Sequence, residues 1–150
     1  MTQKIVHDFP PLMKEINAKF NTLNRSVIYS WGNIIYNPTR MYIPPSLMVH
    51  EAVHGRRQQP NPGVWWVLYL ANKSFRFLEE AAAHRAEYQY LCGNGSRLQR
   101  RSARVCVSKR LCGGLYGHMV KRRQANNILD MPEHEFDRIM SAAVEEKGDE

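Results

Sequence analysis

The sequence His50-Glu51-Ala52-Val53-His54 constrains the fold of this chain more than any other feature. Its two histidines are four residues apart, so they share one face only if the segment is α-helical. In a helix, His50 and His54 can bind one Zn²⁺, with Glu51 beside them to accept a proton from water activated by the metal. A chain with six histidines can also show this register by chance. The helix signals around the motif, and the acidic helix downstream, favour a metal-dependent hydrolase.

The composition is that of one globular domain, which we take to span residues 1–150. Apolar residues make up 43% of the sequence, which fits a globular protein rather than a disordered one. The apolar run at 64–70 is much shorter than the ~20 residues that cross a bilayer, so we expect no membrane segment. The N-terminus lacks the apolar stretch of a signal peptide, so the expected location is cytoplasmic. Irregular spacing predicts that the cysteines are free thiols: Cys92, Cys106 and Cys112.

Positive charge is concentrated in the C-terminal half, from about residue 97, in a chain of net charge +7. Such a region could face the phosphates of a nucleic acid or an acidic protein, and it could equally be the solvated face of helices. The tail at 145–150 is acidic, and we expect it to be frayed and exposed. The basic residues are Arg97, Arg100, Arg101, Arg104, Lys109, Arg110, Lys121, Arg122 and Arg123.

The residue pattern predicts an α+β fold that is mainly helical, with a small two- or three-stranded antiparallel sheet before the motif helix. β-branched and aromatic residues flank Gly32-Asn33, which predicts a hairpin between strands at 27–31 and 34–36. Residues 41–43 are a candidate third strand. The segment Pro44-Pro45-Ser46 predicts the start of the motif helix, with Ser46 as a possible cap.

Several further helices are expected. Apolar residues at helical spacing predict a helix over 12–24. The motif helix ends at Pro60-Asn61-Pro62-Gly63, and an apolar helix or lid follows at 64–71. Helix-forming residues predict a long helix at 75–91. Beyond it we expect a basic helix that Gly113-Gly114 interrupts or turns, a helix at 115–129, and a last helix that opens near Pro132 and runs to 143.

Two histidines do not complete a catalytic zinc site, which needs a third protein ligand and an open position for water. Metzincins supply a third histidine six residues after the second, with a glycine three residues after it. Here those positions hold Pro60 and Arg57, which excludes a zinc site of the metzincin type. The other common solution is a glutamate from a separate helix, and the acidic, alanine-rich segment at 77–87 offers one. Its alanines would let it pack close to the motif helix, although alanine is also simply the best helix former.

Within this segment, Glu80, His84 and Glu87 are spaced to share one helix face. Glu80 is the preferred third ligand, and His84 or Glu87 could then donate or accept hydrogen bonds that orient a ligating imidazole. Glu79 lies on a different stripe and could simply be solvated near Arg76. Glu87 is a minor alternative for the ligand, and isolated charged residues on helices are often plain surface groups.

These residues resemble the gluzincin type of zincin metallopeptidase, in which HExxH on one helix and a glutamate on the next hold zinc. The layout at about 34–90, with a looser echo at 111–128, is also similar to small HExxH proteins of phages and bacteria. The resemblance implies a zinc metallopeptidase with His50, His54 and Glu80 as zinc ligands and Glu51 as general base. Larger gluzincins place an acidic residue four positions after the ligand glutamate, where this chain has His84.

In such an enzyme Glu51 takes a proton from the attacking water and delivers it to the leaving amine. A tyrosine or histidine usually donates a further hydrogen bond to the oxyanion. Tyr116 is our candidate because the flanking glycines permit close approach, and the alternatives are His118, Tyr69 and Tyr88.

The expected substrate is a peptide or protein, which zincins commonly bind against an edge strand. The predicted strands 34–36 or 41–43 could offer that edge, and the basic residues could favour an acidic substrate. Trp65 and Trp66 could cover the cleft, although buried core positions are more usual for tryptophan. Two alternatives remain open: an inactive zincin scaffold that binds nucleic acid or protein through the basic 97–123 region, and a structural domain without metal.

Overall fold

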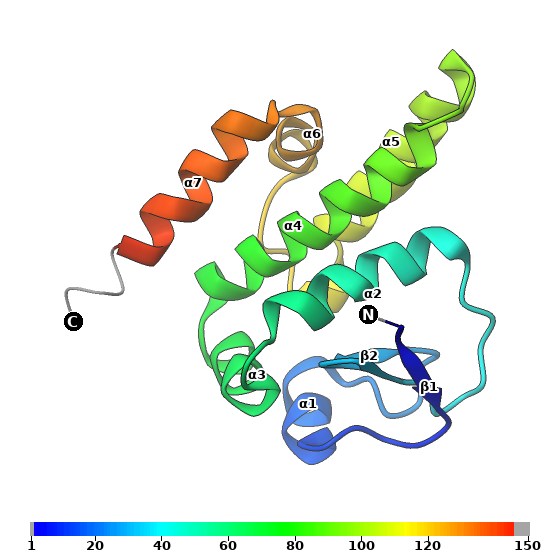
Figure 1. The fold of residues 1–150 in the computed structure, drawn as a ribbon, viewed down its shortest axis with the longest axis vertical. Coiled ribbons are helices and arrows are strands. Elements are labelled where there is room, and N and C mark those ends of the chain that lie inside the picture. Colours follow the sequence, from blue (N-terminus) through cyan, green and yellow to red (C-terminus); the bar gives the residue numbers. More distant parts are fainter. Residues whose placement is uncertain (1, 146–150) are drawn as a thin grey trace.

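The computed structural model describes residues 2–145, which form an array of helices with a small sheet at one end (Figure 1). No helix in this part of the chain is both long and apolar enough to cross a membrane. The elements are β1 (Lys4–Val6), α1 (Met13–Phe20), β2 (Tyr29–Trp31), β3 (Ile34–Tyr36), α2 (Pro45–Arg57), α3 (Pro62–Ala71), α4 (Lys73–Cys92), α5 (Arg97–Leu111), the 3-10 helix η1 (Gly114–Tyr116), α6 (Arg122–Asp130) and α7 (Glu133–Glu145).

The predicted fold class is confirmed, but the sheet is mixed rather than antiparallel. β2 and β3 form the expected antiparallel hairpin, while β1 adds to the other side of β3 in parallel, giving the order β1-β3-β2. The candidate strand at 41–43 is wrong. The side chain of Asn37 binds both backbone groups of Met41, at 2.9 and 3.1 Å, and so occupies the groups that a partner strand would use.

The motif lies on α2, as predicted, and α2 begins with Pro45 in its first turn. Pro44 precedes it in an extended conformation, and no side chain caps the helix, so the expected cap at Ser46 is wrong. The helix ends at Arg57. Asn61 then caps α3 by accepting a hydrogen bond from the backbone N–H of Val64. The predicted end of the motif helix before Pro60 is therefore confirmed, but α3 already begins at Pro62, within the predicted break at 60–63.

The contact between α2 and the hairpin is unusually close. Gly32 occupies the turn with a φ of 61°, a conformation that favours glycine. A Cβ atom at Gly55, the residue after the motif, would lie 2.3 Å from the carbonyl oxygen of Gly32. Only a glycine at position 55 therefore allows α2 to rest directly on the hairpin. This contact brings the motif against β2.

On its other side α2 packs along α4, and α5 packs against α4 in turn (Figure 1). Ala81 and Ala83 of α4 are completely buried, but Ala81 packs in a cluster with α5, α6 and α7 and not against the motif helix as expected. Aromatic residues of α3 form one hydrophobic cluster with α1 and β2, centred on Trp65, Trp66 and Tyr69. A second cluster joins α4 to α5, α6 and α7.

Two predicted helices differ from the observed ones. The helix expected over 12–24 ends at Phe20, because Asn21 has a left-handed φ of 53°. The single helix expected over 115–129 is divided into η1 and α6. Gly117 and His118 both have positive φ, at 80° and 51°, which ends η1. The prediction for the acidic tail falls beyond Glu145, outside the described residues.

Candidate metal centre

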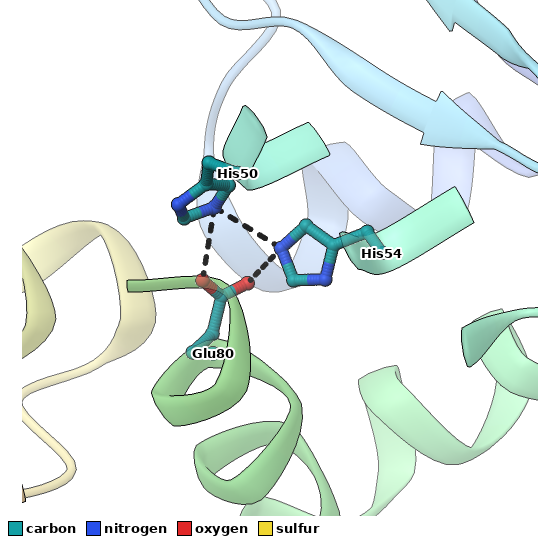
Figure 2. Close-up of side chains that lie close together, drawn as sticks. All are labelled: His50, His54 and Glu80. Atoms are coloured by element: carbon teal, nitrogen blue, oxygen red, sulfur yellow. Dashed lines mark hydrogen bonds and ion pairs between the residues drawn. The ribbon is translucent and has the colours of Figure 1, made fainter. Parts of the chain in front are cut away.

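His50, His54 and Glu80 converge between α2 and α4 (Figure 2). One ligand atom from each residue lies within 4.8 Å of the others, and all three side chains are buried. Nε2 of His50 and Nε2 of His54 are 3.1 Å apart. The carboxylate of Glu80 lies 3.6 Å from Nε2 of His50 and 3.3 Å from Nε2 of His54. This cluster could hold a metal ion, and its members are the three ligands expected from the sequence.

The hydrogen bonding of the cluster is incomplete in a way that suits a cation. Oε1 of Glu80 accepts a hydrogen bond of 2.5 Å from the hydroxyl of Tyr69, whereas Oε2 is buried without any hydrogen-bond donor among residues 2–145. The facing Nε2 atoms of the two histidines can share only one proton. Buried polar atoms are normally satisfied, so a cation beside Oε2 of Glu80 would supply the partner that this oxygen lacks. Two imidazoles and a carboxylate are also a typical catalytic zinc set.

Burial and mutual charge determine the protonation of the cluster. Burial lowers the pKa of His50 well below its usual range, and the neighbouring His84 and His54 lower it further. Burial also disfavours charge on His54 and on Glu80. The charge of Glu80 nevertheless raises the pKa of His54, and the charge of His54 lowers the pKa of Glu80, so both groups stay charged. His50 is therefore neutral and accepts at Nε2 from the charged His54, and Glu80 is an anion. An entering cation would displace the proton of His54, as metal ions generally do.

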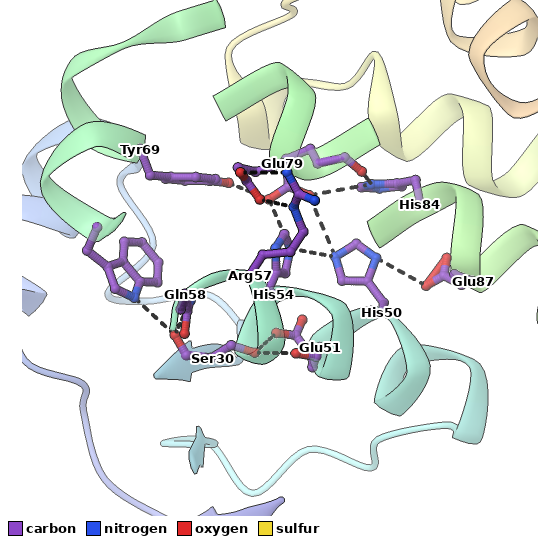
Figure 3. A network of polar contacts seen from close by, with 12 residues as sticks. Ser30, His50, Glu51, His54, Arg57, Gln58, Tyr69, Glu79, His84 and Glu87 are labelled. Carbon is purple, nitrogen blue, oxygen red and sulfur yellow. Dashed lines mark hydrogen bonds and ion pairs between the residues drawn. The ribbon is translucent and has the colours of Figure 1, made fainter. Parts of the chain in front are cut away.

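Glu51 follows His50 on the helix and so faces β2 instead of Glu80. Its carboxylate accepts a hydrogen bond from Oγ of Ser30, which also contacts the backbone oxygen of Glu51 at 3.1 Å (Figure 3). Burial raises the pKa of Glu51 to about 7, against the lowering effects of His54 and Ser30. The carboxyl group can therefore change its protonation state near neutral pH.

Ser30 is the residue of the site that sequence reasoning missed. It is buried, and its carbonyl oxygen accepts hydrogen bonds from Nε2 of Gln58 at 2.9 Å and from Nε1 of Trp66 at 3.0 Å. The one sequence feature that could have indicated Ser30 is that it is a single serine between Tyr29 and Trp31 in an apolar strand. That position alone does not reveal a partner on a helix that comes later in the chain.

Glu79 is also buried, so the expectation that it is solvated near Arg76 is wrong. Arg57, one turn beyond His54, binds both oxygens of Glu79, at 2.5 and 3.1 Å (Figure 3). Arg76 instead donates to the backbone oxygen of Tyr69 at 2.7 Å. The Arg57–Glu79 pair joins α2 to α4 next to the ligand cluster, and it leaves Glu80 as the glutamate that faces the histidines.

The candidate oxyanion donors are divided between two regions. Tyr116 and Tyr69 line the same cavity as the ligand cluster. Burial raises the pKa of Tyr116 well above its usual range, and the charge of Glu80 adds to this effect. Tyr88 instead lies beside Cys92 and the Arg104–Asp130 pair. His118 is exposed and donates from Nδ1 to the backbone oxygen of Cys112 at 3.2 Å. The structure thus brings Tyr116 and Tyr69 to the site and leaves Tyr88 and His118 away from it.

A cavity of about 80 Å³ adjoins the cluster, with side chains of α1, β2 and α3 in its wall. Trp65 and Trp66 belong to its buried wall and do not form a lid. The predicted substrate edge is wrong, because β3 is the central strand and 41–43 is not a strand. β2 is the edge strand beside the site, but the carbonyl oxygen of Ser30 is already bound by Gln58 and Trp66.

Protein-family models, curated proteins and solved structures give no match to this chain. No relative therefore suggests an activity, and the function has to be inferred from the chemistry of the site.

Proposed function

We propose that this protein is a zinc-dependent metallopeptidase of the gluzincin-like type, which hydrolyses peptide bonds with water. The observation that carries the proposal is the buried cluster of His50, His54 and Glu80, which lines one cavity together with Glu51. When bound, zinc polarises a substrate carbonyl and lowers the pKa of water, so that hydrolysis becomes possible at neutral pH.

The protein groups around the cluster have distinct tasks in this proposal. Glu51 accepts a proton from the attacking water and passes it to the leaving amine. Ser30 fixes the carboxylate of Glu51 through its hydrogen bond, in the wall of the cavity that the ligand cluster also lines. Tyr69 donates to Glu80 and so keeps the third ligand in position. Tyr116 retains its hydroxyl proton and can donate a hydrogen bond to the substrate oxygen as negative charge develops there.

Cleavage of a peptide library by wild-type protein and by Glu51→Gln tests this function. We expect both proteins to contain near-stoichiometric zinc after purification without metal-affinity chromatography. Loss of the proton acceptor is expected to lower the cleavage rate by roughly 10²- to 10⁴-fold. Equal cleavage by the two proteins, or none by either, would argue against peptide hydrolysis through Glu51.

The basic region supports a second candidate function, an inactive scaffold that binds nucleic acid or an acidic protein. No acidic residue occurs between Glu87 and Asp130. Within residues 2–145, exposed Arg97, Arg101 and Lys109 of α5 form no ion pair. This function predicts binding of an oligonucleotide or acidic peptide that weakens steeply with salt and is unaffected by Glu51→Gln. Salt-independent or absent binding would exclude it.

A further inference from the structure

Behind His50, a line of polar contacts leads away from the ligand cluster toward α5. We propose that Glu87, held in place by Arg110, is a positioning residue that orients His50 for metal binding. This inference rests on the metal site of the proposed function but not on catalysis. It also extends the metal centre to a helix from the basic C-terminal half.

The ring of His50 needs a hydrogen-bond acceptor on its outer side. Its Nε2 faces His54 and Glu80, so Nε2 is the nitrogen available to an ion. An imidazole that binds metal through one nitrogen carries a proton on the other, and usually donates it to a carboxylate or carbonyl. In His50 that second nitrogen is Nδ1, which is buried and has no hydrogen-bond partner within residues 2–145.

Glu87 offers such an acceptor. Its Oε1 lies 3.8 Å from Nδ1 of His50, on the side of the ring that faces away from His54 (Figure 3). This distance is roughly 1 Å longer than a typical hydrogen bond. The terminal torsion of a glutamate is broad and soft, so a small rotation of the carboxylate would close the gap.

Arg110 explains why a carboxylate can be buried at this place. Glu87 is only 1% exposed, and a buried charge is costly unless it is paired. Nη1 of Arg110 donates to both oxygens of Glu87, at 2.6 and 3.0 Å. Without this partner, the uncompensated carboxylate would be expected to leave its position behind His50.

His84 does not take this role, although it lies one turn after Glu80 and contacts His50. Its Nδ1 lies 2.7 Å from the backbone oxygen of Glu80. Since a carbonyl oxygen can only accept a hydrogen bond, Nδ1 carries the proton and donates the hydrogen bond. Its ring packs edge-on against that of His50, with centroids 4.6 Å apart. His84 thus contacts His50 without accepting its proton, and the carboxylate one turn further along α4 is left to do so.

Zinc affinity, measured by competition with a chelator, tests the inference without a substrate. The variants are Glu87→Gln, Arg110→Met and the charge-conserving Arg110→Lys. Arg104→Met is a matched control, because Arg104 lies on the same helix and also forms an ion pair with a carboxylate, that of Asp130. The two arginine side chains are equally exposed, at 41% for Arg104 and 40% for Arg110. Only Arg110 pairs with a carboxylate that lies beside a ligand of the metal centre, His50.

We expect Glu87→Gln to bind zinc roughly 10- to 100-fold more weakly than wild type, as is usual when the partner of a ligating histidine is lost. Arg110→Met should weaken binding in the same direction, Arg110→Lys should recover part of it, and Arg104→Met should stay within about twofold of wild type. The double variant Glu87→Gln/Arg110→Met should bind no more weakly than Glu87→Gln. The absorption spectrum of bound Co²⁺ should change in Glu87→Gln and not in Arg104→Met.

Unchanged zinc affinity and an unchanged cobalt spectrum in Glu87→Gln would overturn the inference. Tighter zinc binding by Arg110→Met would also overturn it, because Arg110 would then act by repelling the ion. If the wild type itself binds no zinc, the proposed function fails together with the inference. Should Glu87→Gln fail to fold, the two Arg110 variants make the same comparison at a half-exposed position.

Discussion

Among single residues, some positions in the candidate site follow from the spacing of residues along the sequence, and others depend on contacts between distant elements. The separation of His50 and His54 requires one helix face, so their joint position could be predicted from the sequence. Glu80 could be preferred over Glu79 because it shares a face with His84 and Glu87. Ser30 could not be found in this way, because its partner Glu51 comes from a different element. Contacts between distant elements depend on packing, which a residue pattern does not specify.

Removal of the Ser30 hydroxyl isolates its effect on Glu51. Ser30→Ala is expected to lower the rate of peptide cleavage by roughly 10- to 100-fold, equivalent to one hydrogen bond to a charged group, about 1.5–3 kcal/mol. Zinc affinity should not change, because Ser30 contacts no ligand atom of the cluster. Ser30→Thr keeps the hydroxyl and should restore most of the activity. Full activity in Ser30→Ala would show that Glu51 needs no support from β2.

At the scale of elements, the site depends on how closely α2 approaches its neighbours. Gly55 lets α2 rest on the hairpin, and the Arg57–Glu79 pair joins α2 to α4 on the other side. The existence of these helices, and their approximate ends, follow from periodicity, proline and asparagine signals. The parallel strand β1 could not be predicted, because three mostly exposed residues give no alternating pattern. The division of 115–129 into two helices occurs where Gly117, the C-cap of η1, and His118 both have positive φ, and only the glycine is a sequence signal for such a stop.

Gly55→Ala tests the close approach directly. Its Cβ would meet the carbonyl oxygen of Gly32 at 2.3 Å, so the backbone must move. We expect a loss of about 1–3 kcal/mol in the free energy of unfolding, as is typical of overpacked sites, measured by urea denaturation. Gly93→Ala is the control, because its nearest contact would be an ordinary 3.4 Å. Equal stability of the two variants would contradict the proposed packing of α2 on the hairpin.

At the scale of the whole molecule, the ligands come from two helices that are held together only by the folded chain. α2 supplies both histidines and α4 supplies Glu80, while the Arg57–Glu79 pair joins the same two helices beside them. A bound ion would add a further cross-link between α2 and α4. Since an unfolded chain does not preform this cluster, metal binding should stabilise the native state.

Chelation of zinc should therefore lower the thermal unfolding midpoint of the wild type. At free zinc about 100-fold above its Kd, the stabilisation is about 2.7 kcal/mol. For a domain of this size, each kcal/mol corresponds to roughly 2–4 °C. The His50→Ala/His54→Ala variant should unfold at one temperature with or without zinc, as followed by circular dichroism. An equal zinc-dependent shift in that variant would place the ion elsewhere.

If His50, His54 and Glu80 bind one zinc ion together, zinc stoichiometry and affinity must differ between Glu80→Gln and Glu79→Gln. The two glutamates are adjacent on α4 and both buried, but only Glu80 faces the histidines. We expect near-stoichiometric zinc in the wild type and in folded Glu79→Gln, and a large loss of affinity in folded Glu80→Gln. Tight zinc binding by Glu80→Gln, or no zinc in the wild type, would contradict a site shared by these three residues.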